Sequence, residues 1–213
     1  MRRSIFISAI LLCSIISAFP QNKVKNPELA RLIDNLAAED QKPYERVKKG
    51  EITSQQAELD FRAVTAKNLV QLKSIVKKYG YPTHELVGEA SSHNFWLMVQ
   101  HSDSDLKFQK KLLKLMFKEV KRKNASPRDY AYLVDRVRIN SGEPQLYGSQ
   151  IVVKDSRKGY DLKPVFQPEK LNERRKEIGL PPIEEYLEKA NKLFFELNKN
   201  KLDSENNLSK PKV

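Results

Sequence analysis

The stretch WLMVQHSDSD, residues 96–105, places a histidine and two aspartates at the end of an apolar run. Imidazole ordinarily titrates near physiological pH, so His101 could act as a general base whose ring is held by Asp103 or Asp105. A structural interpretation fits as well. A histidine at a helix C-terminus interacts favourably with the helix dipole, and Asp103 or Ser104 could cap the next helix.

A second polar stretch, GEPQLYGSQ at residues 142–150, could carry ligand contacts. Gln145, Tyr147 and Gln150 offer amide and phenol groups, and Gly148 would allow a close backbone approach. The alternative is that this stretch forms a β-bulge or the entry to a hairpin, where its amides satisfy helix ends. The residues alone support both interpretations.

Three further polar residues lie within expected helices. Gln100 follows the apolar residues FWLMV, so we expect it to be at least partly buried and to need hydrogen-bond partners. Asp135 and Arg136 are neighbours in one helix, where a buried ion pair that joins helices is favoured over catalysis. Arg136 could otherwise contact an anion or oxyanion.

The histidine spacing does not favour a metal site. His93 precedes His101 by eight positions, which is about 12 Å along a straight helix, so the two rings cannot share an ion. The chain also lacks HExxH spacing. We therefore predict no metal and no cofactor.

Hydrophobic periodicity and capping residues predict the elements that position these groups. Pro43 should break or bend the first helix. Thr53 and Ser126 are expected caps, and Gly80 should end the second helix. The expected helices cover residues 27–49, 53–79, 90–101, 104–123, 127–140, 169–178 and 183–201, and the expected strands cover 145–153 and 160–166.

These elements predict a mainly α fold, a single helical domain of five to seven helices with one small β-hairpin near residues 145–166. We assign residues 1–18 to a signal peptide, 19–59 to an N-terminal helical extension, 60–198 to the helical domain, and 199–213 to a disordered tail.

The N-terminus has the features of a secretory signal peptide. Arg2 and Arg3 precede an apolar run at residues 5–16, and small residues follow. A lipoprotein anchored at Cys13 is less favoured, because Leu12 stands where a small residue is expected. Cleavage near Ala18 would remove the only cysteine and leave a secreted or periplasmic chain without a transmembrane span.

The chain is basic. Its 39 Lys and Arg outnumber 27 Asp and Glu, giving a net charge of +12, which becomes +10 when cleavage removes Arg2 and Arg3. An exported basic protein is expected to meet anionic envelope components rather than nucleic acid, and no zinc-finger, RNP-like or phosphate-loop motif is present. A solvated face that maintains solubility is the simpler interpretation. The basic residues gather at Lys107, Lys110, Lys111, Lys114, Lys118, Lys121, Arg122 and Lys123.

Four segments carry a resemblance to a known family: YGYPTHELVG (79–88), FWLMVQHSDSDLKFQ (95–109), YAYLVDRVRINSGEPQLYGSQ (130–150) and NERRKEIGLPPIEEYL (172–187). In order and spacing they resemble the bacterial domain-of-unknown-function family numbered 6624, over roughly residues 60–190. Tyr81 stands where that family typically has tryptophan. The resemblance implies no established activity, but it directs attention to Trp96, Gln100, His101, Asp103, Asp105, Asp135, Arg136, Gln145, Tyr147, Gly148 and Gln150.

Two functions are compatible with these observations. In the first, an exported protein binds or hydrolyses a small molecule in a polar pocket, with His101 and Asp103 as catalytic residues. The ligand contacts would then come from Gln100, Asp135, Arg136, Gln145, Tyr147 and Gln150. In the second, the same groups form a structural network in a non-enzymatic envelope interaction module with a basic surface. The first requires His101 to line a concave pocket.

Overall fold

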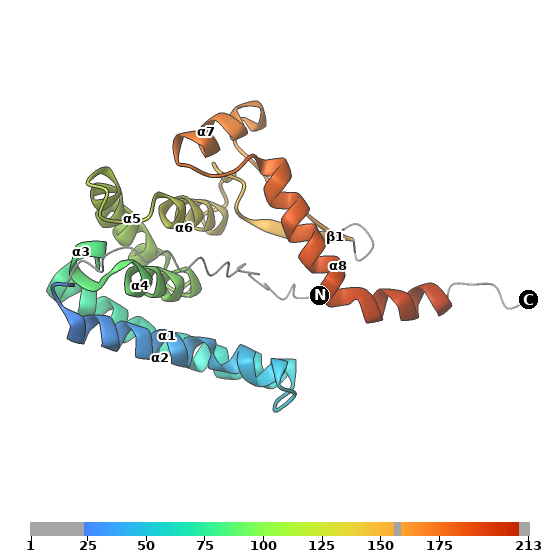
Figure 1. The fold of residues 1–213 in the computed structure, drawn as a ribbon, viewed down its shortest axis with the longest axis horizontal. Helices are drawn as coiled ribbons and strands as arrows, with labels where there is room; N and C mark the ends of the chain where they lie inside the picture. Colours follow the sequence, from blue (N-terminus) through green and yellow to red (C-terminus); the bar gives the residue numbers. More distant parts are fainter. Residues whose placement is uncertain (1–23, 156–158, 209–213) are drawn as a thin grey trace, which may run out of the picture.

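In the computed structural model, which describes residues 24–155 and 159–208, helix α4 (Glu89–His101) lies at the centre (Figure 1). Residues 95–100 are all buried. A helix that is apolar all round must be enclosed by other elements. α4 accordingly packs against α1 (Pro27–Lys48) and α2 (Ser54–Tyr79), and also against α6 (Pro127–Asn140). This arrangement buries Gln100, as predicted, and it also buries Trp96.

α1 and α2 form an antiparallel pair below α4 (Figure 1). Thr53 caps α2, because its Oγ1 accepts a hydrogen bond of 3.2 Å from the Gln56 N–H, and Gly80 ends that helix as predicted. The predicted break at Pro43 is wrong, since α1 continues to Lys48. Pro43 is itself buried, so packing on this face compensates for the hydrogen bond that proline removes.

The predicted N-terminal extension, residues 19–59, contributes to the core in the part that the structure describes. Ile33 is fully buried, and Leu29, Ala37 and Ala57 are nearly so. α1 also contacts α3 (His84–Val87), a one-turn helix that periodicity does not predict. The first helix is therefore an integral layer of the domain, because it covers one side of α4.

α5 (Leu106–Lys121) packs against α6 on the opposite side of α4 from the α1–α2 pair (Figure 1). Ser126 caps α6 as predicted, with its Oγ 3.1 Å from the Asp129 N–H. The predicted cap of α5 is wrong. Asp105, and not Asp103 or Ser104, accepts from the Phe108 N–H at 2.9 Å.

The predicted hairpin is present but short. β1 (Ile151–Asp155) pairs antiparallel with β2 (Gly159–Leu162), with Ile151 opposite Leu162. Gln145 and Val165 form an isolated bridge. Residues 146–149 lie outside the ladder because three of their backbone N–H groups bind a carboxylate of α6.

The C-terminal elements are η1 (Pro168–Lys170), α7 (Leu171–Glu177) and α8 (Ile183–Leu208), and α8 packs on β2. Residues 199–208, which composition predicts as part of a disordered tail, continue α8. The described residues form eight α-helices and one hairpin, a mainly α single domain. The predicted signal peptide with Cys13 lies outside the described residues. None of the described helices is long and apolar enough to span a membrane.

Candidate functional site

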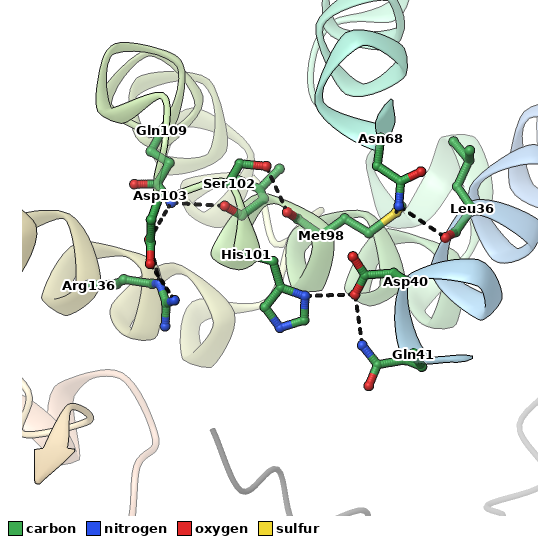
Figure 2. A network of polar contacts seen from close by, with 11 residues as sticks. Leu36, Asp40, Gln41, Asn68, Met98, His101, Ser102, Asp103, Gln109 and Arg136 are labelled. Atoms are coloured by element: carbon green, nitrogen blue, oxygen red, sulfur yellow. Dashed lines mark hydrogen bonds and ion pairs between the residues drawn. The ribbon is translucent and has the colours of Figure 1, made fainter. Parts of the chain in front are cut away.

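His101 is held by an aspartate from the first helix. Its Nδ1 lies 2.7 Å from Oδ2 of Asp40, and the Gln41 amide donates to the same oxygen at 2.8 Å (Figure 2). Phe61 of α2 packs edge-on against the imidazole, with centroids 5.0 Å apart. The His101 side chain is 10% exposed and that of Asp40 0%. The expected pairing of His101 with Asp103 or Asp105 is therefore wrong, because α1 supplies the partner.

Asp103 instead binds α6. Both of its carboxylate oxygens accept from the Arg136 guanidinium, at 2.8 and 2.6 Å, and the Asn140 amide donates at 2.8 Å. The Gln109 amide reaches Asp103 at 3.3 Å and donates to the Val99 carbonyl at 3.0 Å. Figure 2 shows this second cluster to one side of His101, with no bond joining the two. This cluster ties the turn after α4 to α5 and α6. It engages Asp103 and Arg136, which are both predicted site residues, in bonds with other parts of the protein.

Asp135 supports the backbone of the GEPQLYGSQ stretch. Its fully buried carboxylate accepts from the N–H groups of Leu146 at 2.7 Å, Tyr147 at 2.9 Å and Ser149 at 2.8 Å. Burial raises the pKa of Asp135, and these three N–H donors oppose that rise. The expected ion pair that joins helices is formed by Arg136, which binds Asp103 in the turn after α4, whereas Asp135 binds backbone N–H groups instead of a cation.

Gln145 joins the two sides of the hairpin base. Its buried amide donates to the carbonyls of Gln150 and Lys163, both at 2.9 Å, and its Oε1 accepts from the Gln150 N–H at 2.8 Å. The Gln150 side chain contacts only the Ser149 hydroxyl, at 3.3 Å, among the described residues. Of the two interpretations left open for this stretch, the geometry matches the hairpin start.

Gly148 allows this turn to pack closely. Its φ is +70°, and a Cβ there would lie 2.9 Å from the Ile183 side chain. The residue before it, Tyr147, accepts a hydrogen bond of 2.5 Å through its carbonyl from the Arg175 guanidinium. Glycine is required at this position both for the backbone conformation and for the contact with α8.

Arg175 is a buried cation that the sequence analysis missed. It is fully buried, and it donates to the carbonyls of Tyr147 and of Pro181, the latter at 2.6 Å. Its Nη2 has no partner among the described residues, and the guanidinium lies 5.3 Å from the centre of the Tyr186 ring. Burial lowers its pKa. The signal in the sequence is weak, because Arg174 and Lys176 surround it with ordinary surface charges.

His93 forms a second histidine–aspartate pair. Its Nδ1 lies 2.9 Å from Oδ2 of buried Asp129, and its ring lies against Trp96 with centroids 4.9 Å apart. Asp129 belongs to the first turn of α6, where a negative charge interacts favourably with the helix dipole. This pair is more exposed than that of His101, because the His93 side chain is 42% exposed, although Asp129 is itself buried.

The cavity found in the described part of the chain lies away from all of these groups. It has a volume of about 320 Å³ between α2, α3 and α5, and Tyr79, Leu86, Leu115 and Lys118 are among its lining residues. None of the predicted site residues lines it. No group of three or more His, Cys, Asp or Glu side chains in the described ranges is placed to hold a metal ion.

The outer side of α5 carries a row of exposed lysines. Lys107, Lys110, Lys111, Lys114, Lys118 and Lys121, here called the lysine face, are all exposed. Their spacing places them within roughly 100° of arc on one helix, over a length of about 21 Å. None of them forms an ion pair with another described residue. The one acid of α5, Glu119, binds Arg122 at 2.8 Å.

These features define a helical domain whose buried polar groups mainly bind its own backbone and one another. The chain belongs to the family of unknown function DUF6624, whose model matches residues 27–195. The match begins at the first residue of α1, so it includes the helix that supplies Asp40 and extends beyond the 60–190 range of the resemblance. Neither a curated protein nor a solved structure matches the chain.

Proposed function

We propose that this chain is a non-enzymatic interaction module of the cell envelope, exported by its N-terminal signal sequence, which binds an anionic partner through the lysine face. One observation carries the proposal: six exposed lysines on one side of α5 have no anionic partner among the described residues. Like charges held this close repel one another, and an anionic ligand would relieve that repulsion.

The geometry favours this function over a hydrolytic pocket. A general base must come within hydrogen-bond reach of its substrate, whereas His101 is 10% exposed and already binds Asp40. The carboxylate of Asp135 accepts three backbone N–H groups, and Arg136 binds Asp103 through two donors. The groups that could do chemistry therefore stabilise the fold, which leaves the surface as the place of interaction.

The experiment measures binding to a generic polyanion, immobilised dextran sulfate, as a function of salt. The triple variant Lys111→Glu, Lys114→Glu, Lys118→Glu changes the lysine face. The control Lys48→Glu, Lys49→Glu, Lys67→Glu alters the net charge equally with exposed lysines of the α1–α2 pair. We expect the parent and control to be retained and to elute with salt, and the α5 variant to lose most of its retention.

Equal losses in the two triple variants would contradict the proposal, since binding would then follow net charge and not the lysine face. Circular dichroism of each variant checks that α5 still folds. Both sets of lysines are exposed and lie outside the polar clusters, so neither triple variant alters those clusters directly.

A further inference from the structure

We propose that the lysine face, together with Phe117, docks on a lipid bilayer that contains anionic phospholipids. This inference rests on the proposed function and names its partner. The bilayer is favoured over a soluble anionic polymer by the kind of cation on the face, by the aromatic residue beside it, and by its shape.

The cations of the face are all lysines. The lysine ammonium is a compact, strongly hydrated charge on a flexible stem, whereas arginine presents a rigid fork that suits bidentate recognition of individual phosphates. Exposed lysines therefore suit a diffuse array of mobile headgroups. Each lysine near an anionic leaflet contributes about a fivefold gain in partitioning, so six together can hold a protein at the surface.

Phe117 is the aromatic residue at the edge of the face. It is 43% exposed, and it lies one helical turn from Lys114 and from Lys121. The Lys121 ammonium lies 4.4 Å from the ring centre, and Tyr130 supports the ring from α6 with centroids 5.6 Å apart. A half-exposed aromatic ring among lysines is the composition of surfaces that lie in the membrane interface, because the ring enters the headgroup region while the ammonium groups bind phosphates.

The shape of the face agrees with this partner. All six lysines come from one helix and form a ridge along it, and Lys118 alone among them also lines the cavity between α2, α3 and α5. Leu112 and Met116 on the opposite side of α5 are fully buried, which fixes the ridge rigidly to the domain. A straight ridge of about 21 Å can meet a planar surface along its whole length. A flexible polymer is usually bound in a groove that follows its backbone.

The test uses the mature chain, residues 19–213, so that the apolar run at residues 5–16 cannot itself bind lipid. This deletion leaves every described element intact, because α1 begins at Pro27. Co-sedimentation is measured with vesicles of phosphatidylcholine alone and with vesicles that also contain phosphatidylglycerol. The variants are the α5 and control lysine triples, Phe117→Ser, and Phe166→Ser, which alters a side chain of matched exposure, 44%, after β2.

We expect binding only to vesicles with phosphatidylglycerol. The α5 triple should lower it by at least about 100-fold, since three lysines are lost and three glutamates that the anionic leaflet repels replace them, while the control triple changes it little. Phe117→Ser should weaken vesicle binding about fivefold, because roughly half of a phenylalanine side chain no longer leaves water, and should leave dextran sulfate binding unchanged. Phe166→Ser should alter neither.

Three results would overturn the inference. If the chain binds dextran sulfate through the α5 lysines but not anionic vesicles, the partner is a soluble or wall-bound polymer, and the proposed function stands without the bilayer. If Phe117→Ser and Phe166→Ser weaken vesicle binding equally, Phe117 does not enter the interface. If the chain binds neither dextran sulfate nor vesicles with phosphatidylglycerol, the proposed function is wrong as well.

Discussion

His101 at the end of α4 contacts Asp40 of α1, a residue 61 positions earlier in the chain, through a hydrogen bond of 2.7 Å. Asp40 is fully buried, and its second oxygen, Oδ1, has no partner among the described residues. The imidazole is enclosed further by Phe61 of α2. The hydrogen bond thus joins α1 to α4, and the Phe61 ring adds a contact from α2. Loss of Asp40 leaves the His101 Nδ1 without its partner, and loss of His101 leaves the buried Asp40 carboxylate with only the Gln41 amide as donor.

Replacing either partner should destabilise the fold. We expect His101→Ala and Asp40→Ala each to lower the free energy of unfolding by about 1–3 kcal/mol, as measured by urea denaturation. The double variant should be much less destabilised than the sum of the two, because the second substitution removes a group whose partner is already missing. Additive losses would show that the hydrogen bond contributes little.

Gln150→Ala is the comparison for His101→Ala. The backbone N–H and carbonyl of Gln150 bind Gln145, whereas its side chain forms a hydrogen bond only with the Ser149 hydroxyl among the described residues. We therefore expect a loss below about 1 kcal/mol, because truncation leaves the backbone contacts in place. A loss as large as that of His101→Ala would mean that the Gln150 amide has a role that these contacts do not explain.

Asp135→Asn should destabilise the turn although the two side chains have the same shape. The carboxylate accepts from Leu146 and Tyr147 through one oxygen and from Ser149 through the other. An amide group would place an N–H against one of these N–H groups, at an expected cost of about 1–3 kcal/mol. Hydrogen exchange of the Ser149 amide should also accelerate. Unchanged exchange at this amide would contradict the assignment.

At Arg175, we expect the substitution that keeps the charge to destabilise the fold more than the one that removes it. Lysine at this position keeps a buried charge but cannot reach both the Tyr147 and the Pro181 carbonyl, whereas methionine removes the charge. We expect Arg175→Lys to cost about 3–5 kcal/mol and Arg175→Met about 1–3 kcal/mol. Thermal and urea unfolding of both variants would measure the order. A lysine variant more stable than the methionine variant would show that hydrogen bonding outweighs desolvation.

His84 should contribute a pH dependence of stability. Burial lowers its pKa below the ordinary value of 6.5, so the unfolded chain takes up the proton before the folded chain does. The contribution of His84 to the free energy of unfolding is therefore fully present above pH 6.5. It is lost as the pH falls through 6.5 towards the lower pKa of the folded state. We expect the parent to lose more stability between about pH 7.5 and pH 5 than His84→Gln does. If the stability of the parent and of His84→Gln falls equally over this pH range, His84 is not the source of the pH dependence.

Much of the fold follows from residues close to one another in the sequence. Thr53 and Ser126 begin their helices, and Gly80 ends one, because capping depends on groups within a few positions. The lysine face is also readable, since the period of an α-helix brings Lys107, Lys114 and Lys121 to one side. Local rules were less reliable at Pro43 and in the predicted tail, where helix continues in the structure.

The sequence by itself thus determined most of the helices, the hairpin and the basic ridge, whereas the tertiary structure decided the partners of His101, Asp103 and Asp135. Asp40 lies within α1 and Asp103 in the turn after α4, and the first binds His101 while the second binds Arg136, 33 positions away. A carboxylate can satisfy itself with any nearby donor, and which donor is near depends on how the helices pack. Periodicity along one helix contains no information about that packing.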